Sequence, residues 1–309
     1  MIAELAQRMR RHDASPRTLE LLRATVEKLC CQYSRRDAAD LRRDAHGWLA
    51  LVVELLRRPT GLRAHHELLV AGGWLALLAG CVEYDLGLRA AAEGSRTTAA
   101  QLGVEAEHHE IIGWSHELTA WFALTQGRLR DAVAAAQIGQ AIAQSSSVHA
   151  QLIAQEAKAK ARLGSTGLGE LLQTGRDKLE RLPYPDRPDN HFKVDPAKWD
   201  YLSMDIHRIA GDNDLARTYA QTVIRDNLAS DGTDLSPMRT SECRLTLAFV
   251  AAREGDLEQA VGTALDALRG ARRSRPHLSM ITHELAQELH TSFPGERLVH
   301  DFEESLRAI

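Results

Sequence analysis

Glycines recur at the ends of apolar, helix-forming segments, and this recurrence limits the possible fold more than any other feature of the chain. They occur in "YDLGLRAA", "LTQGRLRDA", "ARLGSTGLG", "IAGDNDLA" and "AREGDLEQA", at Gly87, Gly127, Gly164, Gly211 and Gly255. Successive members are 40, 37, 47 and 44 residues apart. Glycine ends helices because it adopts the left-handed backbone conformation without strain. A period of about 34–47 residues with one tight turn per unit is typical of a solenoid built from helical hairpins.

The segment that begins at Ser241 shows the repeat most clearly. Its sequence is "SECRLTLAFVAAREGDLEQAVGTALDALRGA", and small or apolar residues fall where a tetratricopeptide repeat requires them. In its second helix the apolar residues follow one helical face: Leu257, Ala260, Val261, Ala264, Leu265 and Leu268. Helix-forming residues dominate the chain, and aromatic residues make up only 5%. We therefore predict an all-α fold, a tetratricopeptide-like right-handed α-solenoid of helical hairpins.

Composition argues against several classes of protein. The net charge of −4 gives no overall nucleic-acid footprint. The four cysteines have no zinc or redox spacing, and we expect them to be small buried residues of a protein in a reducing compartment: Cys30, Cys31, Cys81 and Cys243. The most apolar stretch, Leu68–Val82, is shorter than the roughly twenty residues of a membrane span and indicates a helix buried on several sides. We expect a cytoplasmic protein with no membrane segment.

A proline-rich segment divides the helical pattern. "LPYPDRPDNHFKVDPAKWDY" contains four of the nine prolines. Since prolines stop a helix and favour extended backbone, residues 182–196 are predicted to be an insertion. Residues 1–60, beginning with a helix at about 2–12, are expected to form capping or dimerisation helices. Residues 61–309 are expected to form the repeat domain.

Several strings together resemble a known family. They are "LRRDAHGWL", "LAGCVEYDLG", "HELTAWFALTQGR", "QEAKAKARLG", the proline-rich segment and "LSPMRTSECRLTLAFVAAREGDLEQAV". They are similar to the C-terminal tetratricopeptide-like region of actinobacterial XRE-like helix-turn-helix transcriptional regulators, over roughly residues 25–295. The resemblance implies a ligand- or partner-sensing region that often forms a dimer. The chain opens inside what look like the connecting helices, so either a DNA-reading domain was removed or there is none. We do not expect direct DNA contact by this chain.

The first candidate site lies in "EAEHHEIIGWSHELTAWF", which we interpret as part of one helix over residues 105–126. Helical geometry places Glu105, His109 and His116 on one side, opposite the apolar face. In such repeats the first helix of each pair lines the concave groove, so these residues and Ile112 are candidates for ligand contact. A solvated face is the alternative. His109 and His116 are also weak candidates for metal ligands, although we predict no metal site and no cofactor.

The second candidate site follows from the proline-rich insertion. We predict that it crosses the concave face as a stiff strap, or else acts as a spacer. Residues on the strap and on the groove side of the next helices are candidate ligand contacts: Tyr184, His191, Phe192, Tyr201, Met204, Asp205, Arg208 and Arg239.

Two main hypotheses for function follow. The leading one is the ligand-sensing or protein-interaction portion of an XRE-like regulator, a homodimer that binds a small metabolite or short peptide, or a protein partner. The alternative is a biosynthetic enzyme that uses Glu105, His109, His116 and Asp205 for acid–base or metal chemistry. No Gly-x-Gly-x-x-Gly, phosphate loop or Gly-x-Ser-x-Gly motif is present, which disfavours an ordinary cofactor-dependent enzyme. An interaction scaffold without a small ligand is the third possibility.

Overall fold

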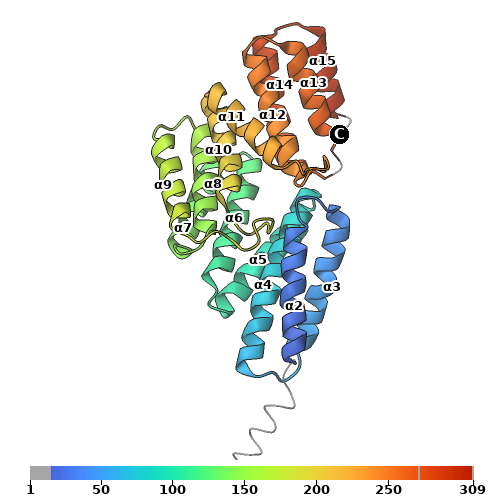
Figure 1. Cartoon of the computed structure of the whole chain (residues 1–309), viewed down its shortest axis with the longest axis vertical. Helices are drawn as coiled ribbons and strands as arrows, with labels where there is room; N and C mark the ends of the chain where they lie inside the picture. The colour runs from blue at the N-terminus through green and yellow to red at the C-terminus, as the bar shows by residue number, and fades with distance from the viewer. Residues whose placement is uncertain (1–14, 271, 308–309) are drawn as a thin grey trace, which may run out of the picture.

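The structure, a computed structural model, describes residues 15–270 and 272–307 (Figure 1). In these residues the fold is all-α, with fourteen helices and no strand. One isolated β-bridge joins Leu228 to Asp234 in the loop before α12. The predicted all-α solenoid of helical hairpins is therefore confirmed. The helix expected at about residues 2–12 lies outside the described residues.

The helices follow one another with short connections. Their bounds are α2 (Pro16–Cys31), α3 (Ala38–Leu56), α4 (Leu62–Asp85), α5 (Arg89–Glu105), α6 (His109–Thr125), α7 (Leu129–Ile142), α8 (Val148–Arg162), α9 (Leu168–Glu180), α10 (Pro196–Ala210), α11 (Asn213–Asp226), α12 (Pro237–Arg253), α13 (Leu257–Leu268), α14 (Arg275–Ser292) and α15 (Arg297–Arg307).

Glycines with left-handed backbone close the hairpins, as the sequence predicts. The five glycines of the repeat have φ between 70° and 88° and end α4, α6, α8, α10 and α12: Gly87, Gly127, Gly164, Gly211 and Gly255. Gly295, with φ of 80°, ends the sixth hairpin between α14 and α15. Each turn therefore reverses the chain between an inner and an outer helix.

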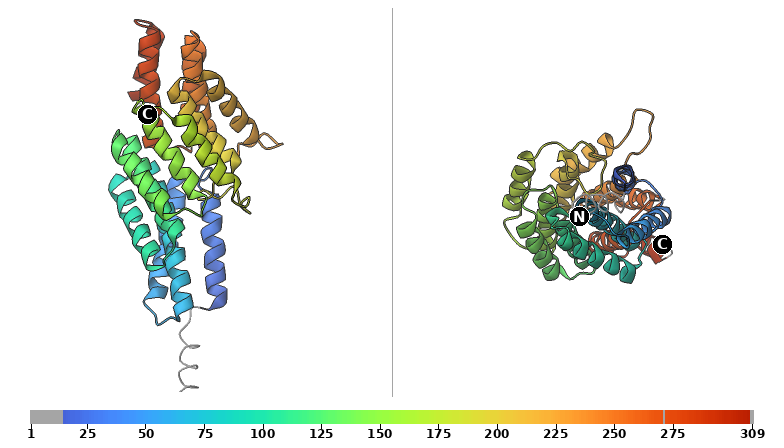
Figure 2. Two further views of the ribbon diagram at one scale, coloured as in Figure 1. Left: turned by 90° about the vertical axis from the view of Figure 1, so that its left-hand side faces the viewer. Right: turned by 90° about the horizontal axis from the view of Figure 1, so that it is seen from below.

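The first helices of the hairpins form the inner layer. In sequence, α4, α6, α8, α10, α12 and α14 each contact the next, while α5, α7, α9, α11, α13 and α15 pair with them from outside. The series closes, because α14 also contacts α4 and α6. The view along the long axis shows the helices arranged around a common centre (Figure 2). The two ends of the inner layer are therefore in contact.

A buried ion pair joins the two ends of this series. Arg272, before α14, donates to Asp85 Oδ2 at 2.8 Å and to the carbonyl of Tyr33 at 3.0 Å. Both charged side chains are almost fully buried. The contact spans 187 residues of sequence and holds the start of α14 against the end of α4.

The long apolar helix α4 is a core helix of this fold. It is long and apolar enough to cross a membrane, but 72% of its most apolar 18-residue stretch is buried inside the fold. Its buried face includes Leu75, Leu78 and Cys81, and the four cysteines are free and buried as expected. The predicted helix buried on several sides is therefore confirmed.

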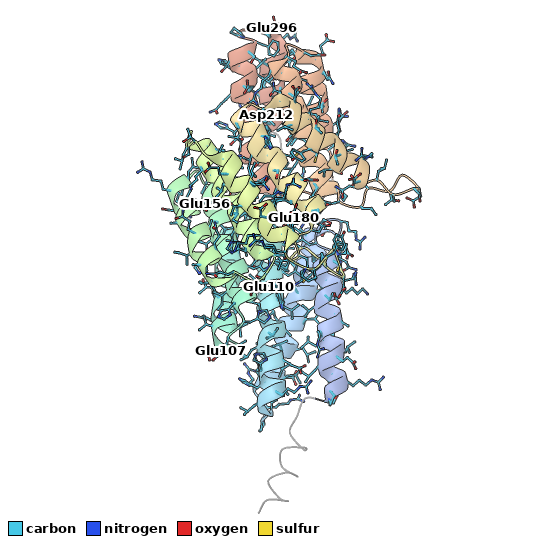
Figure 3. All side chains as sticks on the ribbon, turned by 60° about the vertical axis from the view of Figure 1, so that its left-hand side comes forward. Glu107, Glu110, Glu156, Glu180, Asp212 and Glu296 are labelled. Atoms are coloured by element: carbon cyan, nitrogen blue, oxygen red, sulfur yellow. The ribbon has the colours of Figure 1, made fainter. Side chains whose placement is uncertain are left out.

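The segment between α9 and α10, residues 181–195, contains no helix, as predicted, and is called the strap below. It starts after Glu180, which is labelled in Figure 3, and crosses the middle of the molecule in Figure 1. Its end is fixed by Asp195, whose side chain accepts from the backbone N–H of Lys198 at 2.8 Å and so caps α10. Phe192 and Val194 are buried, which anchors the strap in the core.

Candidate functional site

An inner cavity of about 110 Å³ lies on the concave side of the solenoid. Its walls come from α6, α8, α10, α12 and α14, from the turn after α2 and from the strap. One water molecule requires about 10–15 Å³ by the same kind of measure, so this space holds several waters or a small molecule. The inner helices place charged and polar side chains here.

On one wall, α6 and α8 hold a buried carboxyl between two amides. Gln151 and Gln155, one turn apart on α8, donate to Glu117 Oε1 at 3.0 and 2.7 Å. Burial raises the pKa of the Glu117 carboxyl, while the two amide donors act in the opposite direction. The Oε1 atoms of both glutamines are buried without a hydrogen-bond partner in the described part of the chain.

On the opposite wall, α10, α12 and α14 bring together three polar side chains. Tyr201 donates to Glu242 Oε2, and His277 Nε2 lies 3.1 Å from the same oxygen without hydrogen-bond alignment. Burial alone would raise the pKa of the Glu242 carboxyl, but His277 and Tyr201 outweigh it and lower that pKa. Glu242 is therefore held as an anion that already has its partners.

Two cations of the cavity have no carboxylate partner within ion-pair distance among the described residues. Lys198 is 4% exposed, donates from Nζ to the carbonyl of His191 at 2.6 Å and lies 5.1 Å from the Trp114 ring centre. Burial and the neighbouring Arg239 lower the pKa of the Lys198 ammonium to about 7. The Arg239 guanidinium lies 5.7 Å from the ring centre of Tyr201. These two groups place cations at the cavity wall without a direct ion-pair partner, although Glu117 and Asp195 attract the Lys198 ammonium from farther away.

The strap closes one side of the cavity through His191. Its ring lies 3.8 Å from the Tyr33 ring centre, and its Nε2 atom lies 3.7 Å from Cys81 Sγ. Its backbone N–H donates to the carbonyl of Cys30 at 3.2 Å, which attaches the strap to α2. Burial lowers the pKa of His191 well below its usual value, so the ring is neutral near pH 7. His191 therefore acts as a neutral wall residue.

A buried ion network continues from the cavity between the inner helices. Asp205 Oδ2 lies 3.4 Å from Lys158 Nζ, and Arg208 donates to Asp205 Oδ1. Glu284 on α14 accepts from Arg162 at 2.6 Å and from Arg208 at 3.2 Å. Burial would raise the pKa of Asp205, but the three cations around it hold that pKa well below its usual range. The network ties α8, α10 and α14 together beside the cavity.

The structure places the predicted strap and α10–α12 residues in three environments. His191, Tyr201 and Arg239 line the inner cavity. Asp205 and Arg208 lie in the adjoining ion network. The other predicted residues of this group do not line the cavity: Met204 and Phe192 are buried in the core, and Tyr184 is 66% exposed on the outer part of the strap.

The structure does not bring Glu105, His109 and His116 together at the cavity. The interpretation of residues 105–126 as one helix is wrong, because Glu105 ends α5 and His109 begins α6. The turn between them contains Glu107, whose φ of 50° interrupts the helix and which Figure 3 labels. Glu105 and His109 are both exposed.

His116 and Ile112 lie against the outer layer. A Cβ added at Gly139 of α7 would be 2.9 Å from the Cβ of His116, which shows how closely His116 approaches α7. Burial and the charge of Arg96 on α5 lower the pKa of His116. Ile112 packs against Gly103 of α5. The cavity-facing residues of α6 are instead Glu117 and Trp121.

The residues of the catalytic alternative therefore lie in different parts of the structure and do not form one site. Glu105 and His109 are exposed, His116 is half-buried beside α7, and Asp205 is engaged in the ion network. Within residues 15–270 and 272–307, no group of three His, Cys, Asp or Glu side chains is arranged to hold a metal ion.

Sequence reasoning missed most polar residues of the cavity, among them Glu117, Gln151, Gln155, Lys158, Lys198 and His277. A signal was present for three of them. Gln151, Gln155 and Lys158 are spaced by four and three residues, so they form one polar stripe on α8. A polar stripe on an otherwise buried inner helix indicates a polar interior.

Comparisons of this chain with protein families, with curated proteins and with solved structures find no match. Function is therefore inferred from the cavity itself.

Proposed function

We propose that this chain is a receptor that binds a small molecule in the inner cavity. The observation that carries the proposal is the set of polar groups around this cavity. Among the described residues, Lys198 and Arg239 have no carboxylate within ion-pair distance, and two buried amide oxygens lack a donor. Unpartnered polar groups cost free energy when they are removed from water. A bound polar molecule would supply the missing partners.

The position of the cavity supports a sensing role. Its walls include the turn after α2 and the start of α14. These two segments come together only when the end of the solenoid packs against its beginning. A molecule that contacts both parts would bind the closed solenoid better than an opened one. It would therefore shift the population toward the closed form. The N-terminal helices would pass this change to a partner.

The resemblance to XRE-like regulators gives this receptor its biological setting. We propose that it is the ligand-sensing or protein-interaction portion of such a regulator, acting in the cytoplasm as a homodimer. Size-exclusion chromatography with light scattering tests the dimer. A mass equal to one 34.2 kDa chain at micromolar concentration would contradict that part of the proposal.

Native mass spectrometry of the purified full chain tests the receptor proposal. We expect a retained molecule in the wild-type protein and its loss in Arg239→Met. Arg244→Met is the matched control, because Arg244 is exposed on the same helix, five residues farther along. A retained molecule in all three proteins would contradict binding in the inner cavity, as would an empty wild-type protein that no small molecule stabilises in a thermal-shift screen.

Acid–base catalysis is a second candidate for the same cavity. The geometry that favours it places two buried ionisable groups, Lys198 and Glu117, on the wall of one cavity. Burial also lowers the pKa of the Lys198 ammonium to about 7, where it can give or take a proton near neutral pH. This hypothesis uses Lys198 and Glu117 in place of the residue set predicted from the sequence. Mass spectrometry of a bound compound before and after incubation tests it, and recovery of only unchanged compound would contradict it.

A further inference from the structure

The arrangement of charges in the inner cavity restricts the kind of molecule that fits. We infer that the ligand is a small zwitterion of the amino-acid type, with its carboxylate toward Lys198 and Arg239 and its ammonium toward Glu117, Gln151 and Gln155. This inference rests on the proposed receptor function and adds the chemical class of the ligand.

The cationic side requires an anion. Lys198 donates only to a backbone carbonyl, and Arg239 contacts an aromatic ring. Neither has a carboxylate within ion-pair distance in the part of the chain that the structure describes. A buried ammonium without a direct ion-pair partner is costly, and a guanidinium matches a carboxylate with two parallel hydrogen bonds. A ligand carboxylate would satisfy both cations.

The groups around Glu117 require a donor. Gln151 and Gln155 both turn their amide nitrogens toward Glu117 Oε1, and this contact fixes the orientation of each amide. A reversed amide would place an oxygen against the carboxyl oxygen, which is unfavourable. Their Oε1 atoms are therefore held as acceptors, and both are buried without a partner among the described residues. Because Glu117 adds negative potential, an ammonium fits this side better than a neutral donor.

Other classes of ligand satisfy only part of the cavity. A dicarboxylate would place a second anion near Glu117, and a polyamine would leave Lys198 and Arg239 without an anion. A neutral sugar would supply donors but would leave the two cations without a counter-charge. The volume of about 110 Å³ favours a single amino acid over a longer peptide.

Isothermal titration calorimetry of the full chain tests the inference directly. The probes are the twenty common amino acids, with the decarboxylated amine and the deaminated acid of each one that binds. We expect at least one amino acid to bind, and its amine and its acid to bind at least about tenfold more weakly, because each loses a charged hydrogen bond. Binding of none of the twenty overturns the inference, as does equal affinity for an amino acid and its two analogues.

Variants test the two sides separately. Arg239→Met should weaken amino-acid binding more than about tenfold, because it removes a charged hydrogen-bond donor, and Lys198→Met is the second variant for the same side. Arg244→Met should leave it unchanged. Glu117→Gln should weaken binding of the amino acid but not of its deaminated acid, since only the ammonium faces that position. An equal loss for both probes would overturn the proposed orientation.

Failure of this inference is distinguishable from failure of the receptor proposal. A dicarboxylate, polyamine or sugar that binds in the cavity would overturn the zwitterion but support the receptor. A retained non-zwitterionic molecule in native mass spectrometry would have the same consequence. An empty protein that none of these classes stabilises would overturn both.

Discussion

The buried pair between Arg272 and Asp85 offers the sharpest test of the closed solenoid. Arg272→Met removes the cation and keeps an apolar chain of similar length. It leaves Asp85, which is fully buried, without its 2.8 Å partner. It also removes the donor to the carbonyl of Tyr33 at 3.0 Å. The change therefore leaves an isolated charge and an unpaired carbonyl at the junction of α4 and α14.

The expected magnitude follows from these contacts. Two unit charges about 4 Å apart attract by about 4 kcal/mol at an effective dielectric constant of about 20. In the intact pair this attraction offsets the desolvation of both ions. After Arg272→Met the desolvation of Asp85 remains without compensation, so we expect a loss of about 3–5 kcal/mol in the free energy of unfolding. Asp85→Asn should cost a similar amount, because it leaves Arg272 buried without a counter-charge.

A double-mutant cycle in urea, followed by circular dichroism, measures this effect. The double variant leaves no buried charge, so its loss should be smaller than the sum of the single losses by about 2 kcal/mol or more. Arg269→Met is the control, because Arg269 forms an exposed pair with Asp266 and should cost about 0.5 kcal/mol or less. A loss for Arg272→Met as small as for Arg269→Met would refute the reasoning that this pair closes the solenoid.

Three further predictions concern packing, backbone and pH. Gly175→Ala should lower the free energy of unfolding by at least about 1–3 kcal/mol, because the new Cβ would lie 2.0 Å from the Trp199 ring. Thermal denaturation measures this loss, and an unchanged midpoint would contradict the packing. Glu107 and Gly127 both have positive φ, which glycine adopts without strain. Glu107→Gly should therefore stabilise the fold by up to about 1 kcal/mol, and Gly127→Ala should destabilise it by about 1 kcal/mol. Denaturant midpoints that move in the opposite directions would contradict this. The pKa of Lys198, about 7 in the folded state against an ordinary value of 10.5, means that the folded chain binds fewer protons than the unfolded chain between these pH values. Stability should therefore rise with pH in that window relative to Lys198→Met, by up to about 1.4 kcal/mol per pH unit, and parallel stability–pH curves for the two proteins would contradict this.

Local signals in the sequence were sufficient to predict the hairpins. Gly127 and Gly255 end helices because their backbone is left-handed, and this property can be read from the residue type. Ser15 caps α2 by accepting from the N–H of Thr18, and Asp195 caps α10 by accepting from the N–H of Lys198. Each precedes a proline, and such a pair is typical of a helix start. These features depend only on residues within one or two turns of each other.

The turn at Glu107 was expected about four residues earlier, before Glu105, because glutamate carries no turn signal. It lies 20 residues after Gly87 and 20 before Gly127, midway between two predicted turns. Helix-compatible residues continue through it, so the sequence indicated one helix from Glu105 onward. This error placed Glu105 and His109 on a common face that does not exist.

The composition of the inner cavity depends on contacts that local patterns do not encode. In an open solenoid the polar side of each inner helix would face a solvated groove, and His116 was assigned to the groove on that basis. Because α14 returns to α4 and α6, the inner helices are buried on nearly all sides. The side of α6 that faces the cavity then carries both a charged residue, Glu117, and an aromatic residue, Trp121. A helical wheel cannot identify such a side, because it is neither polar nor apolar throughout. The contact between Arg272 and Asp85, far apart in sequence, reveals the closure.

The most direct test of the receptor proposal is a crystal structure of the full chain grown with a mixture of the twenty common amino acids. We expect density for one small zwitterion inside the cavity, with its carboxylate at Arg239 and Lys198 and its ammonium near Gln151 and Gln155. Density that fits only water in the cavity, or an amino acid bound solely on the outer helices, would contradict it.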